Sequence, residues 1–285
     1  MRVYLSVDLE GVNGVVHSSQ TQPGEPGYER AVGLMHKETN AVIEGLLRAG
    51  AGEILVNDSH WDARNLRIEL LHERASLISG WQKPFSMATG VDGKMSQAGE
   101  GQIDAACFIG YHSRACTATG VLSHTYRAQI YNDVKLNDQS VGETGLNAAL
   151  AGYFGVPVIM VTGDDIACAE AKVLLGNTHC VQVKKAVSRY SAVCFPYAQT
   201  LEQLTKGAET ALKNADKCNA YKVPSPSTIK IRMVDPAMAD GAELMPGVKR
   251  LGPLEIEFSH AEYPVLFKQF LAVGVLAAAR RDPYF

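Results

Sequence analysis

The sequence predicts an α/β fold with three layers (α/β/α), in which helices cover both faces of a largely parallel or mixed central sheet. Through the first two thirds of the 285 residues, strand-like and helix-like segments alternate, which is typical of such sheets. The first segment, Arg2–Val7, is rich in β-branched and aromatic residues, as a buried strand should be. In sheets of this kind, ligands bind beyond the carboxyl ends of the strands.

Short apolar runs mark the strands, which we expect at 2–7, 53–57, 75–79, 105–111, 119–123, 129–136, 139–141, 156–162, 180–184, 228–234, 248–251 and 254–258. Strict alternation supports 228–234. The pairs Asn137-Asp138 and Gly252-Pro253 mark hairpin turns.

Apolar side chains at helical spacing lie between these strands. They predict helices at 28–49, 65–73, 86–97, 142–153, 165–175, 196–213 and 264–280. In the first helix, Gly50 is a plausible C-cap. The long polar loop 12–27 that precedes it is typical of an active-site loop.

The composition fits one catalytic domain, 1–285, in which the strand-rich segment of about 185–260 is a candidate smaller lobe. The net charge is −3 and no run of Lys or Arg occurs, so no nucleic-acid or anionic-membrane partner is expected. Neither the N-terminal apolar run nor 271–279 is long enough for a signal peptide or a membrane span. The six cysteines are scattered without a CxxC pair, which favours a cytoplasmic protein with reduced thiols.

Two carboxylates follow the first strand. Asp8 and Glu10 project to the same side if the extended backbone continues, because strand side chains alternate between faces. Two acids at the end of a buried strand repel each other, and a metal ion between them would relieve the repulsion. The alternative is a pair of solvated acids at a strand end.

Other ligand-type side chains follow later segments: His60, His112, His124 and Glu143. Each alone has a structural explanation, such as a core histidine satisfied by a backbone carbonyl or an acid in the first turn of a helix. Together they place carboxylates and imidazoles at one edge of one predicted sheet. These ligand types suit zinc and similar metals, and their number suits a two-metal hydrolase.

The motifs that carry these residues resemble a known family, the zinc-dependent D-aminopeptidases of the bacterial dipeptide-operon type. The matching motifs are SVDLEG at 6–11, VNDSH at 56–60, GYHSRA at 110–115, SH at 123–124 and VGETGLNA at 141–148, with ISGWQKPFSM at 78–87 and TGDD at 162–165. They occur in order over nearly the whole chain. Beyond about residue 188 the resemblance is loose.

The resemblance implies a three-layer metallopeptidase with two Zn²⁺ ions per subunit. It implies that the metal ligands are Asp8, Glu10, His60, His112 and Glu143, with Asp8 bridging, and that His124 is the catalytic histidine. It also implies a homodecamer of stacked rings that encloses the active sites. The expected reaction is hydrolysis, by a metal-activated water, of short peptides with an N-terminal D-amino acid such as D-alanine.

Two other functions remain as alternatives. One is a different di-metal amidase that acts on peptidoglycan-derived peptides. The other is a non-catalytic peptide- or nucleoside-binding protein whose acids hold the ligand directly. Covalent catalysis is disfavoured, because neither Ser113 nor Cys116 lies in a GxSxG motif.

Overall fold

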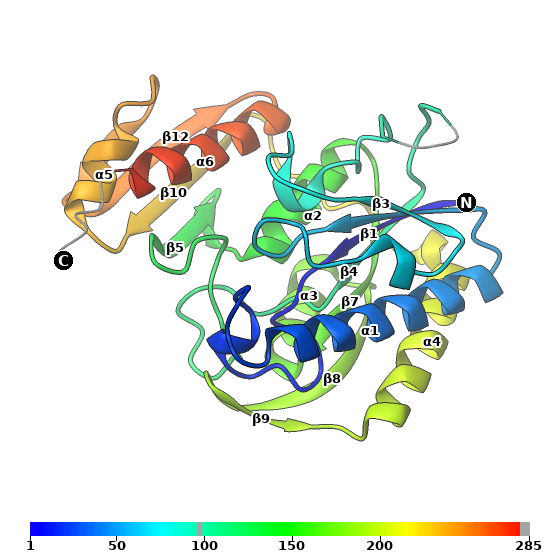
Figure 1. The fold of residues 1–285 in the computed structure, drawn as a ribbon. Helices are drawn as coiled ribbons and strands as arrows, with labels where there is room; N and C mark the ends of the chain where they lie inside the picture. The colour runs from blue at the N-terminus through cyan, green and yellow to red at the C-terminus, as the bar shows by residue number, and fades with distance from the viewer. Residues whose placement is uncertain (96–98, 280–285) are drawn as a thin grey trace.

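The computed structural model describes residues 1–95 and 99–279. Its main sheet has seven strands in the order β3-β2-β1-β4-β7-β8-β9 (Figure 1). These strands are β1 (Arg2–Val7), β2 (Glu53–Asp58), β3 (Ala75–Ile78), β4 (Ala105–Ile109), β7 (Val158–Asp164), β8 (His179–Ser188) and β9 (Ser191–Cys194). All neighbours are parallel except β9, which is antiparallel to β8 at the sheet edge.

Helices cover both faces of the main sheet. The pair α1 (Tyr28–Arg48) and α4 (Tyr197–Lys213) lies side by side on one face (Figure 1) and shares an apolar core with Val3, Leu5 and Val7 of β1. The alternate β1 residue Tyr4 belongs to the core on the other face, with α2 (Glu143–Tyr153) and α3 (Asp165–Leu175). The predicted three-layer α/β/α fold with a mixed sheet is therefore confirmed.

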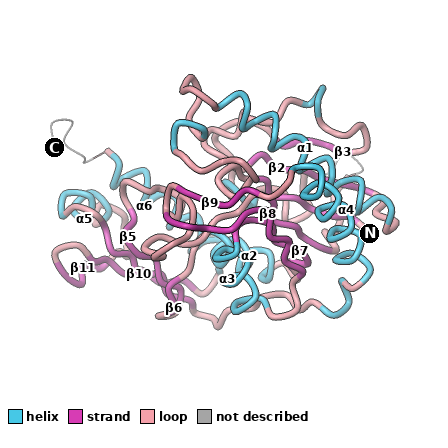
Figure 2. Tube along the Cα trace, turned by 90° about the horizontal axis from the view of Figure 1, so that it is seen from below, coloured by secondary structure: helices cyan, strands magenta, loops and turns pink. Residues whose placement is uncertain are grey.

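A second, antiparallel sheet lies beside this body (Figure 2). Its strand order is β11-β12-β10-β5-β6. Its strands are β5 (Tyr131–Leu136), β6 (Gln139–Ser140), β10 (Ser227–Met233), β11 (Lys249–Gly252) and β12 (Glu255–His260). The helices α5 (Pro236–Ala242) and α6 (Tyr263–Ala278) accompany it, and α6 also packs on α2. Helix α2 is consequently buried at every position from Glu143 to Gly152.

The segment 185–260, expected as a candidate smaller lobe, is divided between the two sheets. Strand β9 and helix α4 belong with the main sheet, whereas β10, β11 and β12 form the second sheet. That sheet also contains β5 and β6 from the middle of the chain. Strands β5 and β6 belong to the second sheet because β5 pairs antiparallel with β10, with Leu136 opposite Ile229.

Several expected elements differ in the structure. The segment 119–123 is not a strand, because the Val121 N–H bonds the Asp164 side chain and Leu122 adopts a left-handed φ of 50°. The helix expected at 65–73 is a single 3₁₀ turn, Ile68–Leu70. In the helix expected at 86–97, the described residues form only the 3₁₀ turn Ser86–Ala88. Positions 96, 97 and 280 of the expected helices lie outside the described residues. Strand β9 and helix α5 were not predicted.

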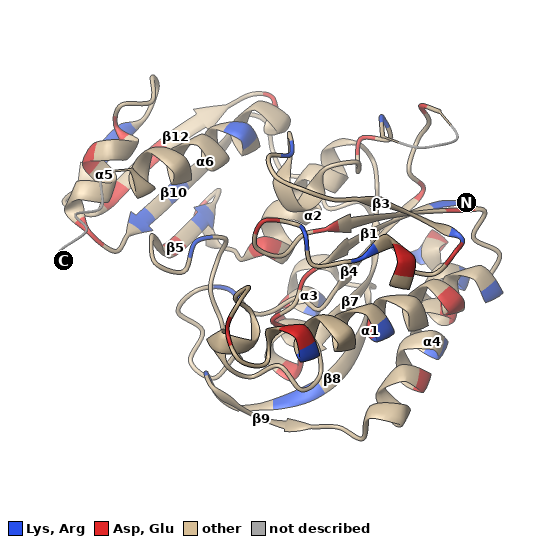
Figure 3. Ribbon diagram, viewed as in Figure 1, with Lys and Arg blue, Asp and Glu red and all other residues tan. Residues whose placement is uncertain are grey.

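Acidic and basic side chains are interspersed along the described elements (Figure 3). None of the described helices is both long and apolar enough to cross a membrane.

Candidate metal centre

The carboxyl ends of β1, β2 and β4 converge at one edge of the main sheet. Asp8 follows β1 directly, and its N–H donates to the carbonyl of Ile109 at 2.8 Å, which extends the pairing of β1 with β4. His60 lies just beyond β2 and His112 just beyond β4. The turns pack closely here: a Cβ on Gly11 would lie 2.1 Å from the carbonyl oxygen of Tyr111.

Asp8 lies between two histidines. Its Oδ1 is 3.2 Å from Nδ1 of His60, and its Oδ2 is 3.4 Å from Nε2 of His112. Because each carboxylate oxygen faces a different imidazole, Asp8 is placed where a ligand shared by two metal ions would be.

Each histidine also faces a second carboxylate. Oε2 of Glu10 is 3.0 Å from Nδ1 of His60. Oε2 of Glu143, the first residue of α2, is 3.2 Å from Nε2 of His112, and its Oε1 is 3.7 Å from Nε2 of His124. The ligand atoms form two groups, Asp8-Glu10-His60 and His112-His124-Glu143, within each of which they lie at most 4.8 Å apart.

The backbone orients all three imidazoles. Nε2 of His60 donates to the Thr21 carbonyl at 2.6 Å, Nδ1 of His112 to that of Ser113 at 3.0 Å, and Nδ1 of His124 to that of Leu122 at 2.8 Å. A carbonyl only accepts, so each of these ring nitrogens carries a hydrogen. The other ring nitrogen faces the acids, and a backbone contact of this kind also orients metal-binding histidines.

Several buried polar atoms of this centre have no hydrogen-bond partner, and a bound cation would satisfy them. Among the described residues, Asp8 Oδ2, Glu10 Oε2 and His112 Nε2 are buried without a hydrogen-bond partner. Such atoms are costly unless something satisfies them. Burial, reinforced by the Glu10 carboxylate, raises the pKa of Asp8 to about 7. The donor set of oxygen and imidazole nitrogen therefore fits divalent zinc.

His124 differs from the other histidines. Its side chain is 16% exposed, whereas that of His112 is 1% exposed. Burial, together with the neighbouring His112, lowers its pKa, so the ring is neutral at physiological pH. The structure thus brings all six predicted residues together and leaves His124 the most open of the three histidines at the centre.

A cavity of about 1010 Å³ opens onto the centre. Five of the six residues line it: Asp8, Glu10, His60, His124 and Glu143. Trp61 and Trp81 are half exposed on its wall, and the loop 122–130 contributes another side. The volume accommodates a short peptide.

One supporting residue was missed in the sequence. The fully buried ammonium of Lys184 donates to the carbonyls of Glu10, Val12 and Val15 at 2.6, 2.9 and 2.6 Å. It thereby fixes the loop that carries Glu10. The available signal was a lysine directly after the apolar run of a buried strand, a position that requires hydrogen-bond partners.

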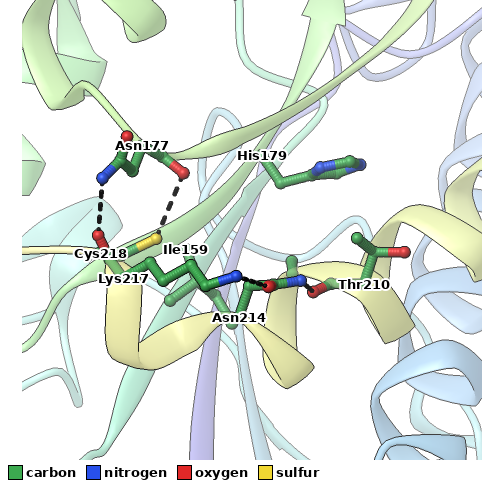
Figure 4. Close-up of a pocket in the computed structure, with 8 residues that line it drawn as sticks. Ile159, Asn177, His179, Thr210, Asn214, Lys217 and Cys218 are labelled. Carbon is green, nitrogen blue, oxygen red and sulfur yellow. Dashed lines mark hydrogen bonds between the residues drawn. The ribbon is translucent and has the colours of Figure 1, made fainter.

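A smaller cavity of about 270 Å³ lies at the amino end of β8, beside His179 (Figure 4). Its polar groups bond one another: Lys217 donates to the Asn214 side chain at 2.6 Å, and Asn177 donates to the Lys217 carbonyl at 2.9 Å. These contacts already satisfy the groups that a ligand would need, so this cavity has a structural explanation.

Comparison with known proteins agrees with this geometry. A D-aminopeptidase of Bacillus subtilis (strain 168) is 37% identical over 278 residues, which cover 97% of this chain and 98% of the relative. A solved structure of the zinc-dependent D-aminopeptidase DppA from Bacillus subtilis, a self-compartmentalizing protease, superposes with a TM-score of 0.92 at 37% identity. It covers 98% of both chains. The family model described as D-aminopeptidase matches residues 1–272, and the chain belongs to that family.

Proposed function

We propose that this protein is a zinc-dependent aminopeptidase that hydrolyses short peptides bearing an N-terminal D-amino acid, such as D-alanyl dipeptides. The observation that carries the proposal is Asp8, with one oxygen toward each of two buried histidines. Membership of the D-aminopeptidase family and the similarity to a zinc-dependent relative support it.

We assign two zinc ions to each subunit. Asp8 would be shared, Glu10 and His60 would complete one site, and His112 and Glu143 the other. The two ligand groups and the unpartnered buried atoms favour this count over a single ion. When bound, zinc supplies a Lewis acid for the scissile carbonyl and lowers the pKa of water.

Residues of the chain would orient the ligands and transfer protons. Glu143 is held by the Tyr126 N–H, which donates to its Oε1 at 2.6 Å. His124, neutral and facing the cavity with Nε2, would carry a proton to the leaving amine. The free α-amine of the substrate would lie at the metal centre, which would explain cleavage at the N-terminus of a peptide.

We also propose a cytoplasmic homo-oligomer, a homodecamer if the resemblance holds in full. The relative is a self-compartmentalizing protease, and a protease of that kind encloses its active sites by assembly. On α6, Phe267 and Phe270 belong to the core of this chain, whereas Val265 and Val275 are exposed. A monomer mass by light scattering at micromolar concentration would contradict the assembly.

The proposed activity is tested by elemental analysis of protein purified without chelator, combined with assays on D-alanyl and L-alanyl dipeptides. We expect about two zinc ions per subunit and faster cleavage of the D-alanyl peptide. Preference for peptidoglycan-derived substrates would favour the other di-metal amidase. Metal-free protein that binds peptides without cleaving them would make this a binding protein.

A further inference from the structure

Three cationic side chains line the cavity of the metal centre: Lys83, Arg127 and Arg189. Two of them already bind oxygen atoms of the chain. Lys83 donates to the Asn57 side chain at 2.6 Å and to the Asp58 carbonyl, and Arg189 donates to the Ser123 carbonyl at 2.5 Å. Within residues 1–95 and 99–279, the guanidinium of Arg127 makes no hydrogen bond or ion pair.

Arg127 lies one residue from the centre. It follows Tyr126, whose N–H is 2.6 Å from Oε1 of Glu143. Consecutive Cα atoms are about 3.8 Å apart, and an extended peptide spans about 3.3–3.6 Å per residue. The backbone of Arg127 therefore lies one residue from the contact with Glu143, and its side chain lines the same cavity as the carboxylates.

The wall opposite Arg127 is built to admit its side chain. A Cβ on Gly274 of α6 would lie 3.1 Å from Nε and 3.2 Å from Cδ of Arg127, and 2.4 Å from the Tyr131 hydroxyl. Glycine leaves room for the arginine between the loop and α6. The preceding Tyr126 adopts a left-handed φ of 55°, a backbone conformation that is costly for a tyrosine and that directs the chain here.

We propose that Arg127 binds the C-terminal carboxylate of the short peptide substrate and so restricts the enzyme to peptides of two or three residues. This inference rests on the proposed peptidase function. The planar guanidinium presents two parallel donors that match a carboxylate, and a partly buried pair of this kind is strong. The metal centre at one end of the cavity would receive the amine while Arg127 receives the carboxylate, and the two contacts would fix both the orientation and the length of the peptide.

The test compares free-acid and amide forms of the same substrates, D-alanyl-D-alanine and D-alanyl-D-alanyl-D-alanine. We expect the wild type to prefer the free acid at one of these lengths. Arg127→Gln should raise the KM for that acid by about 10- to 100-fold, since a hydrogen bond to a charged group is lost, and leave the amide within a few-fold. Arg127→Lys should retain part of the preference.

Arg232→Gln is the matched control. Arg232 is half exposed on β10 and pairs with Glu255 at 3.5 Å, outside the residues that line the cavity. This variant should treat acids and amides as the wild type does. If Arg127→Gln weakens acid and amide equally, or if the wild type shows no acid preference at either length, Arg127 does not bind the carboxylate.

Calorimetric binding of the same peptides to the zinc-loaded protein separates this inference from the proposed function. In one outcome, the wild type binds the free acid without cleaving it, while Arg127→Gln binds that acid more weakly. This result would support the role of Arg127 and contradict the peptidase activity. Cleavage by the wild type without any acid-specific loss in the variant would do the reverse.

Discussion

The imidazoles of His112 and His124 stack, with ring centroids 4.0 Å apart and planes inclined by 11°. The backbone N–H of His124 also donates to the Ser113 carbonyl at 3.2 Å, which ties the two loops together. The stack holds both rings against Glu143 but at different depths. His112 is enclosed beside Asp8, whereas His124 reaches the cavity.

We predict that His124→Ala retains its zinc and loses most of its turnover. A positioned proton carrier typically contributes about 10²–10⁴-fold, so kcat should fall by that order. The measurement is kcat normalised to bound zinc. Activity within a few-fold of the wild type would make His124 structural, and loss of zinc would make it a ligand.

Asp8→Ala should lose both zinc and activity, because Asp8 is the carboxylate that faces both His60 and His112. Cys116→Ala is the control. That cysteine is exposed and its thiol donates to the Asn132 side chain at 2.9 Å, so the variant should keep both properties. Zinc content and rate are measured on both proteins, and loss of zinc from the Cys116 variant would refute this assignment.

Lys184→Met should weaken both the fold and zinc binding. The substitution leaves three buried carbonyls of the loop 10–15 without their donor, and we expect the free energy of unfolding to fall by about 1–3 kcal/mol. Denaturant unfolding and chelator competition measure the two effects. Lys185→Met, one residue along β8 and exposed, should change neither. Unchanged zinc affinity in the Lys184 variant would limit Lys184 to a structural role.

Glu38 gives a prediction for pH. This carboxyl is fully buried, its Oε1 accepts the Asn13 N–H at 2.9 Å, and burial raises its pKa from 4.5 to about 8. Between these values the folded protein binds more protons than the unfolded chain. The free energy of unfolding therefore falls as the pH rises through this window.

Glu38→Gln removes that titration. The stability of the wild type relative to the variant should be highest below pH 4.5 and should decrease up to about pH 8. Denaturant unfolding of both proteins across this range measures the difference, in which contributions common to both cancel. A difference that is independent of pH would show that Glu38 is already ionised in the folded protein.

The sequence was sufficient to predict most of the main sheet and the gathering of the site residues. Parallel strands bring their carboxyl ends to one edge of the sheet. The proximity of Asp8, His60 and His112 could therefore be predicted without knowing how distant strands pair. The turn at Asn137-Asp138 was also predictable, and both residues adopt positive φ (49° and 67°) as such a turn requires.

Other features depend on contacts that no local pattern shows. The apolar residues of 119–123 suggest a strand, but the Leu122 N–H bonds the Arg189 carbonyl instead of joining a ladder. The ammonium of Lys184 meets its carbonyl partners only after folding. Likewise, the need for glycine at position 274 is visible only in the folded protein, where α6 lies against the side chain of Arg127.

The pairing of β5 with β10 has a consequence for the order in which the protein is made. Strand β5 follows the loop of His124 and Arg127 and leads through β6 into α2, yet its long partner is β10. Long-range antiparallel pairing forms late, because the intervening chain must first be present. A ribosome must therefore deliver the C-terminal third before the loop of His124 and the helix of Glu143 are secured on their outer side. Until β10 has been synthesised, the nascent chain lacks this support for the loop of His124 and for α2.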